Sequence, residues 1–215
     1  GAVARGIPVY ERAQAWGAIM RRYPNALCVA GTHGKTTTTS MCTHIFMAAE
    51  ADPTVMIGGT LPLLHAGYRV GKGDTIILES CEYCNSFLSF FPTVAVILNV
   101  EEDHLDFFKD LRDIQHSFRQ FAELVPEAGS IIVNADNASA MESVAGIAHP
   151  VFTFGLDHPA DCTAVNLTEA DGRPVFDVLV RGEKYAPVEL RVYGPHNVLN
   201  ALAAASAADV LGLPG

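Results

Sequence analysis

The sequence lacks positive charge and long apolar runs. Its 215 residues include 14 Lys or Arg against 24 Asp or Glu, which leaves a formal net charge of −10. Because binding to a nucleic-acid backbone needs clustered cations, we expect no nucleic-acid partner. No apolar run reaches the roughly 20 residues that span a bilayer, and no signal-peptide pattern begins the chain. We therefore expect a cytoplasmic protein with no membrane partner.

A disulfide framework is also missing. The cysteines are few and odd in number, namely Cys28, Cys42, Cys81, Cys84 and Cys162. Cys81 and Cys84 have C-x-x-C spacing, but no second pair and no two histidines lie at the spacing of a zinc site. Two reduced thiols in a loop are the favoured interpretation, and a redox pair is the alternative.

Apolar runs and turn residues alternate along the chain. Apolar periodicity predicts helices at residues 9–22, 36–50, 110–124 and 196–211. Short apolar runs predict strands at residues 27–30, 54–57, 75–78, 93–98, 130–133 and 151–154, and Gly58-Gly59 predicts a turn. Three later β segments, joined by turns, are expected at residues 162–167, 174–180 and 185–192. This order predicts an α/β fold with a mostly parallel, doubly wound sheet and a small antiparallel β appendage.

A glycine-rich segment, residues 30–39, follows the first expected strand and opens the second expected helix. It reads Ala-Gly-Thr-His-Gly-Lys-Thr-Thr-Thr-Thr. Backbone N–H groups at such a helix N-terminus attract phosphate, together with the helix dipole. Lys35 is expected to reach the terminal phosphates, and the Thr36 hydroxyl to bind Mg²⁺. The loop is shortened, since Val29 stands where the standard phosphate-loop pattern has glycine, and a chance Gly-Lys-Thr in a surface turn is the alternative. The residues expected to contact a nucleotide are Gly31, Thr32, His33, Gly34, Lys35, Thr36 and Thr37.

Acidic residues and a histidine follow two other expected strands. Glu79 comes directly after the strand at 75–78, and His104 lies in an acidic segment after the strand at 93–98. Ligands of open α/β sheets bind outside the carboxyl ends of the strands, where a carboxylate near a phosphate loop can hold Mg²⁺. The alternatives are a solvated loop acid for Glu79 and a structural role for His104.

The last expected helix begins with His196-Asn197. Asn197 and Asn200 are three residues apart and share one helix face. Amide side chains can donate to and accept from an adenine edge, and an imidazole can stack on the ring. Helix capping by His196-Asn197 is the alternative.

Four motifs, in this order, resemble those of the Mur ligases, the ATP-dependent amide-forming enzymes of peptidoglycan synthesis. They are G-T-H-G-K-T-T-T-T at 31–39, E-S-C-E-Y-C-N-S-F-L at 79–88, N-V-E-E-D-H-L-D at 99–106 and G-P-H-N-V-L-N-A at 194–201. The resemblance implies three catalytic residues, Lys35, Glu79 and His104. Lys35 would contact the ATP phosphates, Thr36 and Glu79 would hold Mg²⁺, and His104 would help to hold a second metal, with Mn²⁺ as an alternative ion. The residues implied to receive the adenine are His196, Asn197 and Asn200.

The phosphate-loop motif and the opening Gly6-Ile7-Pro8-Val9 most resemble the branch that joins L-alanine to UDP-N-acetylmuramate. The implied reaction consumes ATP and passes through an acyl phosphate. The alternatives are the branch that attaches a tripeptide to the same sugar in murein recycling, a folate polyglutamylating relative, and a module that binds ATP without catalysis. Family enzymes have three domains, and residues 1–215 resemble the central ATP-binding one. An N-terminal UDP-binding domain and a C-terminal domain would lie outside this chain, which alone would not be catalytically complete.

Two departures from the family pattern concern the metal ligands. Several relatives use a carbamylated lysine after the histidine motif, and Lys109 does not match its place. The alanine-adding branch is expected to lack that lysine. The family's acidic segment often reads A-D-E-S-D, whereas this chain has Ser80-Cys81-Glu82-Tyr83-Cys84. The sequence therefore leaves the role of Glu82 open.

Overall fold

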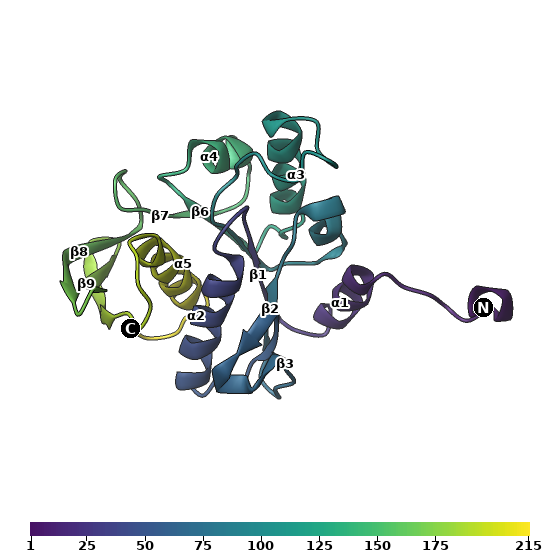
Figure 1. Ribbon diagram of the computed structural model, residues 1–215, viewed down its shortest axis with the longest axis horizontal. Coiled ribbons are helices and arrows are strands. Elements are labelled where there is room, and N and C mark those ends of the chain that lie inside the picture. Colours follow the sequence, from purple (N-terminus) through teal and green to yellow (C-terminus); the bar gives the residue numbers. More distant parts are fainter.

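The computed structural model describes residues 1–215 and places ten strands in one sheet, in the order β10-β9-β8-β7-β6-β5-β1-β4-β2-β3 (Figure 1). The strands are β1 Asn25–Ala30, β2 Thr54–Leu61, β3 Ala66–Arg69, β4 Thr75–Glu79, β5 Val94–Ile97, β6 Ser130–Asn134, β7 Val151–Phe154, β8 Cys162–Ala170, β9 Arg173–Val180 and β10 Glu183–Glu189. The helices are α1 Arg12–Met20, α2 Lys35–Ala48, α3 Leu111–Glu123, α4 Ala138–Val144 and α5 His196–Val210, with short 3-10 turns η1 Val3–Arg5, η2 Pro62–Leu64 and η3 Tyr83–Ser89. No helix is both long and apolar enough to cross a membrane.

The centre of the sheet is parallel and covered on both faces. β1 lies between β4 and β5, and β6 and β7 continue the parallel order. Successive residues of each strand point to opposite faces, so the apolar runs contribute to two separate cores. Helices α2 and α5 lie side by side over one core, and α1, α3 and α4 cover the other (Figure 1). The predicted doubly wound arrangement is confirmed.

The expected antiparallel segments form hairpins, with turns at Asp171-Gly172 and Arg181-Gly182. They extend the edge of the main sheet, because Phe154 of β7 pairs in parallel with Cys162 of β8. The last of these strands ends at Glu189, three residues before its predicted end. Burial alternates along β9, as expected of a strand with one face on the core.

The prediction of a turn at Gly58-Gly59 is wrong, because β2 runs through both glycines to Leu61. Gly58 is needed there for a close approach. A Cβ on it would lie 2.6 Å from Oε1 of Glu79, and its N–H donates to Oε2 of Glu79 at 2.7 Å. The sequence also gave no sign of β3 or α4. Helix α4 has only seven residues, and it begins where the Asn137 side chain accepts a hydrogen bond from the Ala140 N–H.

Candidate active site

The glycine-rich loop connects β1 to α2 at the carboxyl edge of the parallel strands. Gly34 caps the helix with a φ of 84°, a conformation that side chains with a Cβ rarely adopt. A Cβ on Gly34 would also lie 2.5 Å from Oδ1 of Asn200. The loop therefore requires glycine at this position for two reasons, and the predicted strand–loop–helix order is confirmed.

Asn99, which sequence reasoning missed, fastens this loop to the end of β5. Its Oδ1 accepts the His33 N–H at 2.7 Å, and its Nδ2 donates to the His33 carbonyl at 3.1 Å. The Thr32 N–H donates to the Asn99 carbonyl, and the Thr32 hydroxyl accepts from the Glu101 N–H at 2.9 Å. In the sequence, the one indication of a role for Asn99 is that it directly follows the most apolar expected strand, where site residues of an α/β sheet are found. These bonds set the shape of the loop before any phosphate binds.

Lys35 is folded back over its own loop. Its ammonium donates to the carbonyls of Gly31 and Thr32 and to both carboxylate oxygens of Glu82, at 3.2 and 3.0 Å. The Glu82 side chain is only 2% exposed, so this ion pair is almost entirely shielded from water. The sequence left the role of Glu82 open, and the structure makes it the counter-ion of Lys35.

Thr36 and Glu79, expected to act together, are in contact. The Thr36 hydroxyl donates to Oε1 of Glu79 at 2.9 Å, from the first turn of α2 to the end of β4. Both groups are oxygen ligands of the kind that Mg²⁺ prefers. The neighbouring Thr37 is half-buried on the same turn of the helix.

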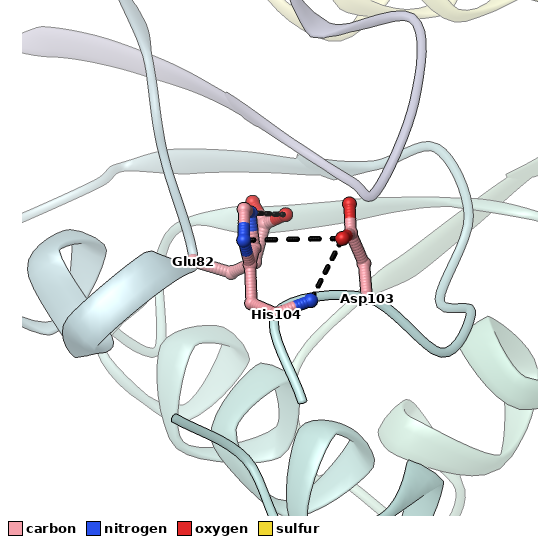
Figure 2. Close-up of side chains that lie close together, drawn as sticks. All are labelled: Glu82, Asp103 and His104. Atoms are coloured by element: carbon pink, nitrogen blue, oxygen red, sulfur yellow. Dashed lines mark hydrogen bonds and ion pairs between the residues drawn. The ribbon is translucent and has the colours of Figure 1, made fainter. Parts of the chain in front are cut away.

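His104 faces two carboxylates, those of Glu82 and Asp103, and Figure 2 shows the three side chains pointing toward one another. Their ligand atoms all lie within 4.8 Å of one another. Nε2 of His104 is 3.8 Å from Oε1 of Glu82, and Nδ1 is 3.8 Å from Oδ1 of Asp103. Two carboxylates and an imidazole suit Mn²⁺ or Mg²⁺ with water completing the coordination. The structure thus brings His104 together with Glu82 and Asp103, neither of which was assigned from the sequence.

Tyr83 forms one wall of this cluster. Its ring centroid is 4.6 Å from that of His104, and its hydroxyl donates to Oδ2 of Asp106 at 2.8 Å. That hydrogen bond to a carboxylate raises the pKa of Tyr83 to about 12. The phenol is therefore a neutral donor at physiological pH, and it restrains the imidazole beside it.

A cavity of about 170 Å³ lies between the phosphate loop and the start of α5. Its lining combines apolar, amide and imidazole side chains from the loop after β1, the carboxyl ends of β5, β6 and β7, and the start of α5: His33, Gly34, Leu98, Asn99, Asn134, Phe154, His196, Leu199 and Asn200. Two of the three residues expected at the adenine, His196 and Asn200, line it. The third, Asn197, is buried behind it, donates to the Tyr193 carbonyl at 2.7 Å and accepts from Nδ2 of Asn200 at 2.9 Å. Asn197 thus orients Asn200.

A model of the Mur ligase middle domain matches residues 29–208, which contain the loop, the acidic residues and the cavity. The chain belongs to the Mur ligase family. It is 44% identical over 208 residues to a UDP-N-acetylmuramate–L-alanine ligase of Clostridium novyi (strain NT), covering 97% of the chain and 45% of that protein. The chain therefore spans less than half the length of this curated relative. The resemblance inferred from the four motifs is confirmed.

Solved Mur ligases share the fold. A UDP-N-acetylmuramate:L-alanyl-γ-D-glutamyl-meso-diaminopimelate ligase from Neisseria meningitides superposes with a TM-score of 0.86 at 30% identity, covering 99% of the chain and 69% of that structure. A UDP-N-acetylmuramate–alanine ligase from Thermotoga maritima gives a TM-score of 0.81 at 27% identity, with 98% and 47% covered. The expected fold class is confirmed by both.

Proposed function

We propose that residues 1–215 are the central ATP-binding domain of an ATP-dependent ligase that joins an amine to a carboxylate. The observation that carries this proposal is the position of Lys35, between a phosphate loop and two groups of cation ligands. The first group is the contacting pair of Thr36 and Glu79. The second is the cluster of Glu82, Asp103 and His104.

Each group has a distinct role in this proposal. Lys35 and the N–H groups of the first turn of α2 bind the ATP phosphates, and Thr36 with Glu79 would hold Mg²⁺ beside them. His104, with Glu82 and Asp103, would hold a second divalent ion, for which Mn²⁺ could substitute. Bound there, the two ions would supply positive charge where negative charge develops on the transferring phosphoryl group. His196 and Asn200 face the base in the cavity.

The proposed chemistry makes a poor acylating agent reactive. A substrate carboxylate oxygen attacks the γ-phosphorus of ATP, the bond to the bridging oxygen breaks, and ADP leaves. The amine then attacks the acyl carbon, loses a proton, and expels phosphate. Lys35 contributes by positioning the phosphates and neutralising their charge, which are the main protein contributions to phosphoryl transfer.

For the whole protein we propose UDP-N-acetylmuramate and L-alanine as substrates. Support comes from the Clostridium novyi relative, a UDP-N-acetylmuramate–L-alanine ligase that is identical to this chain at 44% of the aligned residues. The remaining parts of the substrate sites would belong to an N-terminal UDP-binding domain and a C-terminal domain. A tripeptide acceptor of the murein-recycling kind is the second candidate, because the Neisseria structure gives the higher TM-score of the two described above, 0.86.

Calorimetric titration of the chain with ATP tests the nucleotide site. We expect one-site binding that depends on Mg²⁺ and is abolished in Lys35→Ala. Lys109→Ala is the matched control, since Lys109 is an exposed lysine that takes part in none of the ion pairs of the structure. Equal binding by wild type and Lys35→Ala would contradict the proposal. Phosphate release by the full-length protein, with L-alanine and with the tripeptide as competing substrates, would separate the two acceptors.

A further inference from the structure

Two side chains, Lys35 and His104, approach the carboxylate of Glu82. Lys35 is bound to both of its oxygens, and one of them, Oε1, also faces Nε2 of His104. The Lys35 side chain is 14% exposed and that of Glu82 is 2% exposed. The pair is therefore screened little by solvent, and its attraction is correspondingly strong.

Every N–H bond of the Lys35 ammonium already has an acceptor within the protein. An ammonium group has three N–H bonds. In this structure they are directed at the Gly31 carbonyl, the Thr32 carbonyl and the Glu82 carboxylate. A phosphate that binds Lys35 must therefore displace at least one of these acceptors. The carboxylate is the one whose negative charge a phosphate replaces.

A divalent ion at the cluster would come close to Lys35. Oxygen ligands lie about 2.1 Å from Mg²⁺, and Oε1 of Glu82 is 3.2 Å from the Lys35 ammonium. An ion bound to Oε1 would thus be a few ångströms from another positive charge. Two cations at that separation repel strongly where water is largely excluded.

We propose that Lys35 and a divalent cation compete for the Glu82 carboxylate, so that the Glu82–Asp103–His104 cluster binds a metal more tightly once a nucleotide phosphate draws Lys35 away. In the nucleotide-free chain, Lys35 neutralises Glu82 and lowers the metal affinity of the cluster. Phosphate takes Lys35, and Glu82 becomes available to the metal. The competition thereby sets the order in which nucleotide and second metal bind. This inference rests on the proposed role of Lys35 as a phosphate ligand.

Binding of Mn²⁺ alone, measured in the nucleotide-free chain by the electron paramagnetic resonance of free Mn²⁺, tests the competition. Lys35→Met removes the competing charge, and Lys35→Gln removes it while keeping a hydrogen-bond donor for Glu82, in case the methionine variant does not fold. We expect either variant to bind Mn²⁺ about 5- to 150-fold more tightly than wild type, the usual range for coupled binding events. The gain in Mn²⁺ affinity should vanish when Glu82 is replaced. The double variant Glu82→Gln/Lys35→Gln should then bind Mn²⁺ no more tightly than Glu82→Gln alone.

Lys109→Gln is the matched control for the loss of a positive charge, and it should bind Mn²⁺ as wild type does. Equal Mn²⁺ affinity in wild type and Lys35→Gln would overturn the proposal. So would a gain that persists when Glu82 is glutamine, because the effect would then be general electrostatics. Neither result would contradict the proposed nucleotide site, because ATP binding by the wild-type chain is measured in a separate titration.

Discussion

Asp136 fastens the loop that follows β7, and the substitution Asp136→Asn tests how much that fastening contributes to stability. One carboxylate accepts hydrogen bonds from the N–H groups of Leu156, Asp157 and His158, at 2.6, 3.1 and 2.8 Å. It also meets Nδ1 of His158 at 3.0 Å. The Asp136 side chain is only 11% exposed. The loop begins next to Phe154, which lines the cavity assigned to the base.

The asparagine would lose the charge and turn one acceptor into a donor. If its carbonyl keeps the place of Oδ1, its NH₂ group faces the Leu156 N–H, so two donors meet. Hydrogen bonds to charged groups contribute about 1.5–3 kcal/mol each and are not additive, so we expect a loss of about 2–3 kcal/mol in the free energy of unfolding. With a urea slope of about 2–3 kcal/mol per molar, the unfolding midpoint should fall by about 1 M.

The loss should depend on pH. Burial raises the pKa of Asp136, but the hydrogen bonds from Leu156, His158 and Asp157 outweigh it, and the net pKa is lowered. A group whose folded pKa is depressed stabilises the protein fully above its unfolded pKa, about 3.9 for aspartate. That stabilisation disappears as the pH falls through the folded value. The gap between wild type and Asp136→Asn should therefore be full at pH 7 and shrink below about pH 4.

Asp157→Asn is the matched control, since Asp157 lies in the same loop with an exposed side chain. We expect this control to remain within about 0.5 kcal/mol of wild type, as is usual for exposed sites. Urea melts of the three chains at several pH values provide the comparison. Equal midpoints for wild type and Asp136→Asn at pH 7, or a gap that does not change with pH, would refute the reasoning.

Three further predictions concern the site. Asn99→Ala should weaken ATP binding about tenfold, because two hydrogen bonds that shape the loop at His33 are lost and 1.4 kcal/mol corresponds to a factor of ten; calorimetry that finds wild-type affinity would exclude a positioning role. Asp106→Asn should lower the pKa of Tyr83 from about 12, because the hydrogen bond to a carboxylate favours the neutral phenol. A spectroscopic tyrosine titration, with Tyr83→Phe to identify the signal, checks this, and an unchanged curve would count against the bond. Finally, Cys84 should be the one thiol that reacts quickly with a thiol reagent in the native chain, because the other cysteines are buried or half-buried; rapid reaction of a second thiol would contradict the burial.

Local sequence patterns correctly predicted the strands, loop and helix that carry the site residues. The phosphate loop, the strand before it and the helix after it are signalled by neighbouring residues, because glycine, an apolar run and a helical segment each act over a few positions. Thr36 and Glu79 could be paired from sequence alone, since both follow the carboxyl ends of strands expected in one parallel sheet. The mostly parallel sheet and its two covered faces followed from the same alternation of strands and helices.

Contacts between distant segments could not be predicted in this way. Glu82 is 47 residues from Lys35, and Asn99 is 66 residues from His33. Whether such residues meet depends on strand order and on which way a loop turns after its strand. The glycine at 58 was misinterpreted for this reason. Gly58 lacks a Cβ so that the Glu79 side chain can approach it from a neighbouring strand. In the sequence, a glycine that permits such an approach cannot be distinguished from a glycine that forms a turn.

The sequence by itself determined the family, the fold class and the residue types available for phosphate and metal binding, because these depend on local order along the chain. Only the tertiary structure decided how charges are shared among them. It placed the carboxylate of Glu82 between Lys35 and His104, and it turned Asn197 away from the cavity so that Asn200 faces it. The physical reason is that electrostatic and hydrogen-bonding partners are chosen by distance in space, and burial, which strengthens those interactions, exists only once the sheet and its helices have assembled.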